Sequence, residues 1–366
     1  MGTKALVTGG AGYIGSHVCT ALLAQGWDLA VLDNLSTSTG QALSLVQRIG
    51  GRPVELIQAD IRDRERVFAV LDQGGFDVVL HFAALKVLTD SLTQPLSYYE
   101  QNVSGTVVLL QAMQAAGVRN LVFSSSAAVY GTPLSVPIDE SAPLLGANPY
   151  ARSKAMGEQI IADLVQSDAR WRAVCLRYFN PVGAHESGLL GEMPHSVPSN
   201  LMPIVCDVAL GKRPFLHIFG DEHPTPDGTC IRDFIHVMDL AEGHVQALNW
   251  VLQASPGACL NVNLGTGQGH SVRELVQAFE AASGRAIPCQ TAPVRPGEVP
   301  VVYARAELAR RMLGWQARRS LDDMCRDAWR WVSQAQPPHA VPHEPLPQAP
   351  SSVFPQEGCP ATALAS

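Results

Sequence analysis

The chain has 366 residues, of which 46% are hydrophobic and 16% are charged, and its formal net charge is −7. Such a composition supplies a large apolar core, whereas the acidic balance and the absence of any long Lys/Arg run exclude nucleic acid and acidic membrane surfaces as expected partners. No apolar stretch reaches the roughly 20 residues of a membrane-spanning helix, and none of the eight cysteines forms a Cys-x-x-Cys pair.

Short apolar runs alternate with helical patterns over the first half of the chain. Because these runs are nearly continuous in Val, Leu and Ile, they are typical of buried parallel strands. They are Ala5–Thr8, Leu29–Asp33, Val54–Asp60, Val78–Ala83, Leu121–Ser124 and Val174–Tyr178. Helices are predicted between them, over Ser16–Gln25, Arg64–Leu71 and Val103–Ala116 among others. This order predicts an α/β fold with a doubly wound parallel sheet of the Rossmann type, forming a first domain over residues 1–180.

The sequence pattern changes after residue 180. Residues 181–230 are rich in Gly, Pro and His and show few clean periods, so residues 181–335 are expected to form mainly a smaller mixed α/β lobe that binds the substrate. Predicted strands at Phe234–Val237 and Leu260–Leu264 indicate that segments near 234–264 return to the first domain. Helices are predicted over Met238–Val251, Val272–Ala282 and Leu321–Val332. Eight prolines and almost no charge predict a disordered tail over 336–366.

A glycine-rich loop follows the first predicted strand and opens the first predicted helix. Gly9, Gly12 and Gly15 give Gly-x-x-Gly-x-x-Gly, which allows a tight turn and a close approach of the backbone to a pyrophosphate at the helix N-terminus. Asp33 ends the second strand, where a carboxylate accepts hydrogen bonds from the adenosine ribose and repels a 2′-phosphate. No Lys or Arg directly follows Asp33, so the expected cofactor is NAD rather than NADP.

Tyr150 and Lys154 lie four residues apart and therefore share one face of a predicted helix. The stretch Ser124-Ser125-Ser126 ends the fifth predicted strand, at the edge of the sheet where ligands bind. Together these residues resemble the Ser/Tyr/Lys set of the short-chain dehydrogenase/reductase superfamily, in which proton abstraction from a hydroxyl is coupled to hydride transfer. A free Tyr has a pKa of about 10, so a phenolate base needs a shift of roughly 3 units, which an ammonium and a cationic nicotinamide can supply together.

Five longer blocks narrow the resemblance. The blocks Thr8–His17 (TGGAGYIGSH), Phe123–Gly131 (FSSSAAVYG), Arg177–Ala184 (RYFNPVGA), Asn200–Pro203 (NLMP) and Arg232–Asp239 (RDFIHVMD) are similar to the UDP-glucose 4-epimerase family. The likeness covers roughly residues 1–335. It implies an NAD-dependent isomerase that inverts C4 of UDP-glucose or UDP-galactose through a 4-keto sugar.

The resemblance also implies roles for individual residues. Tyr150 would be the base, Lys154 would lower its pKa and bind the nicotinamide ribose, and Ser126 would orient the substrate oxygen. The implied cofactor contacts are Gly9, Gly12, Tyr13, Ile14, Gly15, Asp33, Asn34, Asp60, Ile61, Phe82, Ala83, Lys86, Gln101, Tyr150, Lys154 and Phe179. The implied substrate contacts are Ser126, Asn180, Asn200, Leu201, His217, Ile218, Phe219, Arg232, Arg295, Glu298 and Val302. The guanidinium forks of Arg232 and Arg295 suit a diphosphate.

The sequence departs from the family's commonest bacterial pattern at a few positions. Ala84 replaces a Gly, Phe234 replaces a Tyr and Glu298 replaces an Asp. Gln101 stands where an Asn usually meets the cofactor. Val302 stands where a Tyr narrows the sugar pocket of relatives. Because a small residue opens that pocket, activity on UDP-GlcNAc and UDP-GalNAc is expected in addition to the non-acetylated sugars.

Three other functions stay open on the sequence. A nucleotide-sugar 4,6-dehydratase needs an acid/base pair beside the serine, but Ser126-Ala127-Ala128-Val129 supplies no carboxylate. An epimerase of UDP-uronic acids needs an extra cation, which the sequence does not locate. A non-catalytic NAD-binding regulator typically lacks the Tyr or the Lys, and this chain has both. The histidines show no coherent metal-ligand spacing, so no metal is expected.

Quaternary structure and location are the last expectations. Helices such as Val103–Ala116 and Tyr150–Leu164 often form a four-helix dimer interface in the relatives, so a homodimer is expected. The chain begins a predicted strand within its first residues, which leaves no room for a signal peptide. Scattered cysteines in such a chain favour a reducing, cytoplasmic location.

Overall fold

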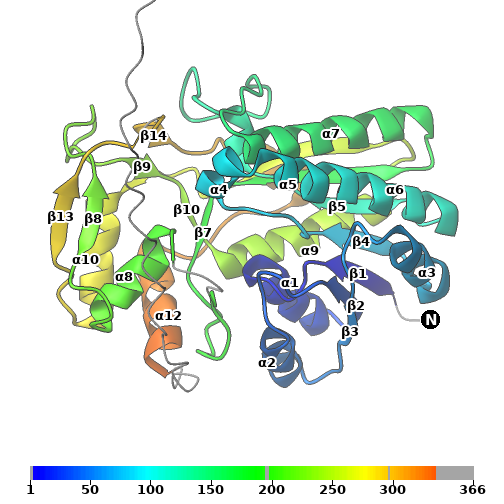
Figure 1. Ribbon diagram of the computed structural model, residues 1–366, viewed down its shortest axis with the longest axis horizontal. Coiled ribbons are helices and arrows are strands. Elements are labelled where there is room, and N and C mark those ends of the chain that lie inside the picture. Colours follow the sequence, from blue (N-terminus) through cyan, green and yellow to red (C-terminus); the bar gives the residue numbers. More distant parts are fainter. Residues whose placement is uncertain (1–2, 194–197, 296, 335–366) are drawn as a thin grey trace, which may run out of the picture. The chain divides into compact units, whose positions relative to one another are not determined.

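A seven-stranded parallel sheet forms the centre of the computed structural model, which describes residues 3–193, 198–295 and 297–334 (Figure 1). Its strand order is β11-β6-β5-β4-β1-β2-β3, and neighbouring strands are parallel throughout. The strands are β1 (Lys4–Thr8), β2 (Asp28–Asp33), β3 (Glu55–Gln58), β4 (Val78–His81), β5 (Asn120–Ser124), β6 (Arg172–Tyr178) and β11 (Cys259–Leu264). The predicted Rossmann-type sheet is confirmed. The strand order reverses between β1 and β4, and ligands bind at the carboxyl ends of strands at such a point.

Helices cover both faces of this sheet because side chains alternate along each strand. On β1, Ala5 and Val7 join one buried apolar cluster, whereas Leu6 between them joins another on the opposite face. The first cluster contains residues of α1 (Tyr13–Ala24), α2 (Gln41–Gly50) and α9 (Val237–Gln253), and the second contains residues of α3 (Arg64–Gly74), α6 (Gly105–Ala116) and α7 (Pro149–Ser167). Full burial of such a Val or Leu side chain contributes about 1.5–3 kcal/mol.

Short helical segments lead from the strand ends toward the crevice. After β4 the chain forms α4 (Leu88–Thr93), α5 (Pro95–Tyr99) and a π-helical turn, η1 (Glu100–Ser104), and after β5 it forms a 3-10 turn, η2 (Ala127–Tyr130). Single π-helical turns are rare in proteins, and those that occur are often found at functional sites.

The second half of the chain builds three small sheets. β7 pairs with β10, β8 pairs with β13, and β9 lies between β12 and β14. These strands are β7 (Asn180–Val182), β8 (Leu216–Phe219), β9 (Ile231–Arg232), β10 (Phe234–His236), β12 (His270–Ser271), β13 (Cys289–Ala292) and β14 (Val301–Val302). The helices are α8 (Leu201–Ala209), α10 (Val272–Ser283), α11 (Glu307–Leu313) and α12 (Leu321–Gln334). A separate apolar cluster, centred on Val205, Ile218, Leu275 and Met324, joins α8, β8, α10 and α12.

Two strands after residue 230 have different partners. The predicted strand at Leu260–Leu264 lies in β11, which pairs with β6 and adds the seventh strand of the large sheet. The predicted strand at Phe234–Val237 corresponds to β10, which pairs with β7 rather than with the large sheet. β11 occupies the edge of the large sheet beside β6. β10 instead pairs with β7, which follows β6 in the chain after Phe179. The described residues belong to one compact unit. The predicted boundary between two domains at residue 180 therefore stays a prediction.

Two further expectations concern the limits of the chain. The predicted disordered tail over 336–366 lies outside the described residues. No helix among the residues that the structure describes is both long and apolar enough to span a bilayer.

Candidate active site

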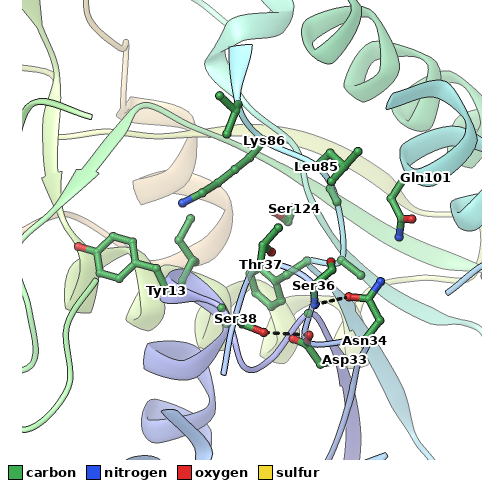
Figure 2. Close-up of a pocket in the computed structure, with 18 of the residues that line it drawn as sticks. Tyr13, Asp33, Asn34, Ser36, Thr37, Ser38, Leu85, Lys86, Gln101 and Ser124 are labelled. Carbon is green, nitrogen blue, oxygen red and sulfur yellow. Dashed lines mark hydrogen bonds between the residues drawn. The ribbon is translucent and has the colours of Figure 1, made fainter. Parts of the chain in front are cut away.

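A cavity of about 370 Å³ lies at the carboxyl ends of the central strands (Figure 2). Most of the predicted cofactor contacts line it. These residues are Gly9, Gly12, Tyr13, Ile14, Gly15, Asp33, Asn34, Ile61, Phe82, Ala83, Lys86, Gln101, Tyr150 and Lys154. The topology therefore brings the glycine loop and the Tyr-Lys pair, which are more than a hundred residues apart in the sequence, to one cavity.

The glycine loop forms a cradle in which Gly9 and Gly15 leave no room for a side chain. Gly9 has a positive φ of 72°, and a Cβ there would lie 2.6 Å from the backbone nitrogen of Ala83. A Cβ on Gly15 would lie 2.4 Å from the carbonyl oxygen of Gly9. Helix α1 begins at Tyr13 without a side-chain cap, so the N–H groups of its first turn are left for an anion. The cradle fits the pyrophosphate of a dinucleotide.

Asp33 ends β2 inside a tight loop. One of its carboxylate oxygens accepts hydrogen bonds from Leu35 N (2.9 Å) and Ser38 Oγ (3.0 Å), and the other accepts from Ala11 N (3.0 Å). Leu35 reaches this position with a φ of 58°, in the left-handed region that favours glycine. Figure 2 shows the Ser38–Asp33 bond and the bond from Ser36 N to Asn34 Oδ1. The carboxylate is thus fixed at the cavity wall, as an adenosine ribose requires.

Asp60 and Phe179 are predicted cofactor contacts that lie behind the cavity wall. Asp60 accepts a hydrogen bond from Asn34 Nδ2 (2.9 Å), and Asn34 itself lines the cavity. The guanidinium of Arg62 pairs with Asp60 and lowers the pKa of that carboxyl to about 2. Phe179 belongs to a small buried cluster that contains Tyr130.

The helix that carries Tyr150 and Lys154 has a clear start. Asn148 accepts a hydrogen bond from Ala151 N at 2.9 Å, and Pro149 takes the first helical position, where its missing N–H costs nothing. Tyr150 then lies in the first turn of α7 and Lys154 in the second. Both are buried, with exposed fractions of 7% and 4%.

Lys154 is held by the end of β5. Its Nζ donates a hydrogen bond to the carbonyl of Ser124 at 2.7 Å and lies 5.1 Å from the centre of the Phe123 ring. Burial lowers the pKa of Lys154 to about 8, while the nearby Glu158 carboxylate acts in the opposite direction.

Without bound cofactor, the pKa of Tyr150 lies above its ordinary value. Burial raises the pKa of its phenol, and the Ser126 hydroxyl opposes that rise. The physical reason is that removal of a phenolate from water disfavours the charged form, and the chain by itself does not overcome this. A lowered pKa needs positive charge beside the phenol, which the Lys154 ammonium and the cationic nicotinamide of bound NAD would supply together.

The serines at the end of β5, Ser124 to Ser126, have different partners. Ser124 lines the cavity and its hydroxyl is 2.6 Å from the Tyr178 hydroxyl. Ser126, the predicted substrate contact, is extended and accepts a hydrogen bond from Ala128 N at 3.2 Å, which starts η2. The sequence motif does not distinguish these roles, because they depend on which way each side chain of an extended segment points.

The π-helical turn η1 presents two neighbouring amides differently. Gln101 faces the cavity (Figure 2). Asn102 is bound to both the N–H and the carbonyl of Leu85 and to Ser153 Oγ (3.0 Å). Gln101 is therefore the amide available to a ligand, and Asn102 connects the β4–α4 loop to α7.

Predicted substrate contacts cluster around β9. The guanidinium of Arg232 pairs with Glu298 at 2.6 Å, and Val302 is the register partner of Arg232 on β14. The guanidinium of Arg295 stacks 3.7 Å from the centre of the Phe219 ring. Glu298 N donates to the carbonyl of Arg295 at 3.0 Å, which joins the two groups.

The remaining predicted substrate contacts lie on three elements. Asn200 lines the cavity at the start of α8, beside Leu201, and Asn180 is exposed at the start of β7. On β8, His217 is exposed, whereas Ile218 is buried in the core of the lobe.

Several cavity residues were not found from the sequence. They are Ser36, Thr37, Ser38, Leu85, Tyr178 and Glu192 among others. The run of hydroxyls directly after Asp33-Asn34 is a local signal for the first three. Glu192 gave no signal: its carboxylate lies 3.4 Å from Lys86 Nζ and 3.3 Å from Asn200 Nδ2, contacts that join distant segments.

Comparisons with known proteins agree with this geometry. A profile of the GDP-mannose 4,6 dehydratase family matches residues 6–328. The UDP-glucose 4-epimerase of Bacillus subtilis is 50% identical over 328 residues, which cover 90% of this chain and 96% of that protein. That of Neisseria meningitidis serogroup B is 48% identical over 331 residues, covering 90% of this chain and 97% of the relative.

Solved structures of the same kind of enzyme superpose on the chain. A UDP-glucose 4-epimerase from Stenotrophomonas maltophila, with bound NAD and formylated UDP-arabinopyranose, has a TM-score of 0.88 and 49% identity, covering 90% of this chain and 98% of that one. The enzyme from Bifidobacterium longum, in complex with NAD+ and UDP, has a TM-score of 0.87 and 44% identity, covering 91% and 99%.

Proposed function

The chain belongs to the UDP-glucose 4-epimerase family, and on that premise we propose that it is an NAD-dependent isomerase that interconverts UDP-glucose and UDP-galactose by inversion at C4. The observation that carries the proposal is that the glycine cradle, Asp33, Tyr150 and Lys154 all line one cavity. This combination supports a tightly held dinucleotide beside a proton-transfer group.

Tyr150 and Lys154 move the proton in the proposed reaction. Bound NAD supplies the acceptor and then the donor of the hydride at C4. Tyr150 takes the proton of the C4 hydroxyl and returns it after the 4-keto sugar has turned. The Lys154 ammonium stabilises the phenolate and binds the nicotinamide ribose, while Ser126 orients the substrate oxygen. Because burial alone raises the pKa of Tyr150, the reaction depends on both positive charges.

Inversion requires a fixed nucleotide and a loose sugar. Arg232 and Arg295 offer two guanidinium forks to the diphosphate, which bidentate hydrogen bonds can hold. Glu298 is paired with Arg232 at 2.6 Å and accepts from a ribose hydroxyl in the proposed complex. The sugar then turns about its link to the anchored UDP, beside Tyr150.

The family profile is named for a dehydratase, but the residues around Ser126 favour epimerisation. A 4,6-dehydratase strips water with an acid/base pair beside the serine. In this chain Ser126 is followed by Ala127, Ala128 and Val129, which form the η2 turn and carry no ionisable group.

An assay without added cofactor tests the proposal. The purified protein is incubated with UDP-galactose, and products are identified by chromatography while absorbance at the NADH wavelength is recorded. We expect UDP-glucose at equilibrium with no net NADH, and a loss of kcat of about 1000-fold in Tyr150→Phe. Net NADH would identify a dehydrogenase instead, and bound NAD without turnover would identify a regulator.

The N-acetylated sugars form a second substrate class in our proposal. Val302 packs beside Phe179 and Val129 with a side chain much smaller than Tyr, which leaves room for an acetamide group. We expect turnover of both UDP-galactose and UDP-GalNAc, and we expect Val302→Tyr to lose the second activity while keeping the first. Failure to convert UDP-GalNAc under conditions that convert UDP-galactose would contradict this substrate range.

A homodimer is our proposal for the quaternary structure. Large apolar side chains are exposed along α4, α5 and α7: Leu88, Leu92, Leu96 and Met156. Burial of such a patch against a second copy follows from the hydrophobic effect. Light scattering after size exclusion should give twice the chain mass, and Leu96→Glu combined with Met156→Glu should give monomers. A wild-type monomer would overturn this.

We further propose a cytoplasmic location. The support is five buried free thiols, of Cys19, Cys175, Cys206, Cys230 and Cys325, which suit a reducing compartment. Fractionation of the source cells with an antibody against the chain tests this, and recovery from an exported fraction would contradict it.

A further inference from the structure

A buried ion pair lies behind the candidate catalytic residues. Glu158 and Arg177 approach to 2.6 Å, and both side chains are only 3% exposed. Glu158 is on α7, one turn after Lys154, and Arg177 is on β6. Such a pair adds little net stability, since well-packed apolar residues often replace buried pairs without loss. A role other than stability therefore has to be considered.

Glu158 also holds the strand end that carries the serines. Its Oε1 accepts from Ser125 Oγ at 2.5 Å and from Arg177 Nε at 3.0 Å, while Oε2 accepts from Arg177 Nη2. Ser125 has no exposed surface and lies between Ser124 and Ser126. The Ser125 hydroxyl therefore points to the ion pair, whereas Ser124 lines the cavity and Ser126 Oγ accepts a hydrogen bond from Ala128 N.

Arg177 extends the network to two further elements. Its Nη1 donates to the Tyr130 hydroxyl and to the carbonyl of Glu140, each at 3.0 Å. The Tyr130 hydroxyl donates to Asn263 Oδ1 at 2.7 Å, on β11. The ion pair thus connects α7, the end of β5, β6, η2 and β11 in one buried set of hydrogen bonds.

We propose that Glu158 is a positioning residue of the epimerase reaction: paired with Arg177, it fixes the Ser124–Ser126 segment against α7 so that Ser126, Tyr150 and Lys154 share one geometry. The carbonyl of Ser124 receives the Lys154 ammonium, and Ser126 reaches Tyr150 closely enough to affect its pKa. Release of Ser125 moves both contacts at once. This inference rests on the proposed function and adds a residue that touches neither sugar nor cofactor.

Glu158 also supplies the charge that faces Lys154. Among the ionisable groups around Lys154, His81 on β4 has a pKa lowered to about 3 by burial, and burial raises the pKa of Tyr178 on β6 and of Tyr150. Without bound cofactor, burial favours the neutral form of these three groups, whereas the Glu158 carboxylate, paired with Arg177, favours the charged form of Lys154. Removal of the Glu158 carboxylate takes away a negative charge near Lys154 and leaves the positive charge of Arg177 unpaired. Both effects disfavour the charged form of Lys154.

The test is Glu158→Gln in the full-length protein with bound NAD. We expect kcat for UDP-galactose to fall about 100-fold with little change in KM, because the reacting groups are misplaced and the nucleotide contacts are not. The alkaline limb of the kcat–pH profile should move to lower pH. A carbon-13 titration of the Lys154 side chain, assigned with Lys154→Arg, should show a lower pKa than in the wild type.

Ser125→Ala provides a second variant in case Glu158→Gln does not fold. It keeps the ion pair and removes one hydrogen bond, so kcat should fall about tenfold at unchanged KM. The matched control is Asp239→Asn, which disturbs a completely buried carboxylate paired with Arg319 at the start of α9. We expect it to lower stability without a change in kcat or in the pH profile.

Each outcome decides between the alternatives. An unchanged pH profile and kcat in folded Glu158→Gln, or in Ser125→Ala where Glu158→Gln does not fold, overturns the inference. The same losses in Asp239→Asn also overturn it, because disturbance of any buried Arg–carboxylate pair would then lower kcat in the same way. A wild type that leaves UDP-galactose unconverted overturns the proposed function alone, and the Lys154 titration still judges the role of Glu158.

Discussion

The cofactor side and the substrate side of the candidate site are built in different ways. The cofactor side consists of loops that directly follow neighbouring parallel strands, and backbone geometry dominates it: Gly9 and Gly15 leave no space for a Cβ, and loop donors already fix Asp33. The substrate side consists of short strands and the loops beside them, and side-chain contacts dominate it, such as the pairs Arg232–Glu298 and Arg295–Phe219.

This difference has a consequence for binding. A backbone cradle exists before the ligand arrives, so the ligand is bound with little rearrangement. The guanidinium groups of the substrate side are instead occupied by the chain's own carboxylate and aromatic ring, and a diphosphate has to share or replace those contacts. The proposed reaction requires firm retention of the cofactor and reversible exchange of the UDP-sugar, and this division of the site suits both.

Gly15→Ala should break the cofactor side with the largest effect. The new Cβ meets the Gly9 carbonyl at 2.4 Å and the Gly10 Cα at 2.8 Å, both of them backbone atoms that cannot turn away. We expect the purified variant to lose most of its NAD and more than about 100-fold of its activity, because the cradle carries the helix N-terminus and the pyrophosphate contacts together. NAD released on denaturation and measured by chromatography gives the occupancy.

Gly40→Ala is the control for this change. Gly40 precedes α2 with a φ of −58°, and the nearest atom to its Cβ would be 3.8 Å away. It should keep its NAD content and activity. Full NAD occupancy in Gly15→Ala would show that the cradle is adaptable and would remove the contrast between the two sides.

The same contrast explains what the sequence predicted. Local patterns predicted the parallel sheet, the glycine loop, Asp33 and the Tyr150/Lys154 pair. The strands follow from short apolar runs, the loop and Asp33 lie where strands end, and the Tyr-Lys pair lies within about one helical turn. The pairing of β10 with β7 and the contacts of Glu192 depend on which distant segments meet. The raised pKa of Tyr150 depends on burial, which no motif encodes.

The substrate-side residues were predicted from the family resemblance rather than from local patterns. Arg232, Arg295 and Glu298 carry no local pattern of their own, and their positions came from the resemblance to a family. The structure adds that they touch one another through Glu298, and that the side chain of Ile218 belongs to the core. Composition alone predicts neither.

Arg232→Ala should sharpen the comparison from the substrate side. Its loss removes a guanidinium fork from the diphosphate and leaves the Glu298 carboxylate unpaired near the nucleotide. We expect KM for UDP-galactose to rise about 100-fold, since truncation of one partner of a hydrogen-bonded charge pair costs about 2–5 kcal/mol. NAD content should not change. Initial rates over a wide substrate range, together with NAD release, measure both.

A loss of NAD in Arg232→Ala would contradict the separation of the two sides. Arg232→Lys distinguishes charge from geometry, because an ammonium keeps the charge but lacks the fork. It should recover only part of the affinity.

The smallest expected effect concerns an Arg–carboxylate pair on the cofactor side. Arg62 lowers the pKa of Asp60 to about 2, below the roughly 3.9 of an unfolded Asp, so the pair stabilises the fold above about pH 4 and loses this contribution as the pH falls toward about 2. Because both side chains are partly exposed, with 41% and 26% accessible, solvent screening reduces the contribution to about 1 kcal/mol or less. Arg62→Ala should therefore be slightly less stable than the wild type at pH 7 in urea unfolding, and the gap should narrow at pH 3. A gap that stays constant between these pH values would mean that Arg62 acts by packing rather than by charge, and that the cofactor side gains nothing from this ion pair.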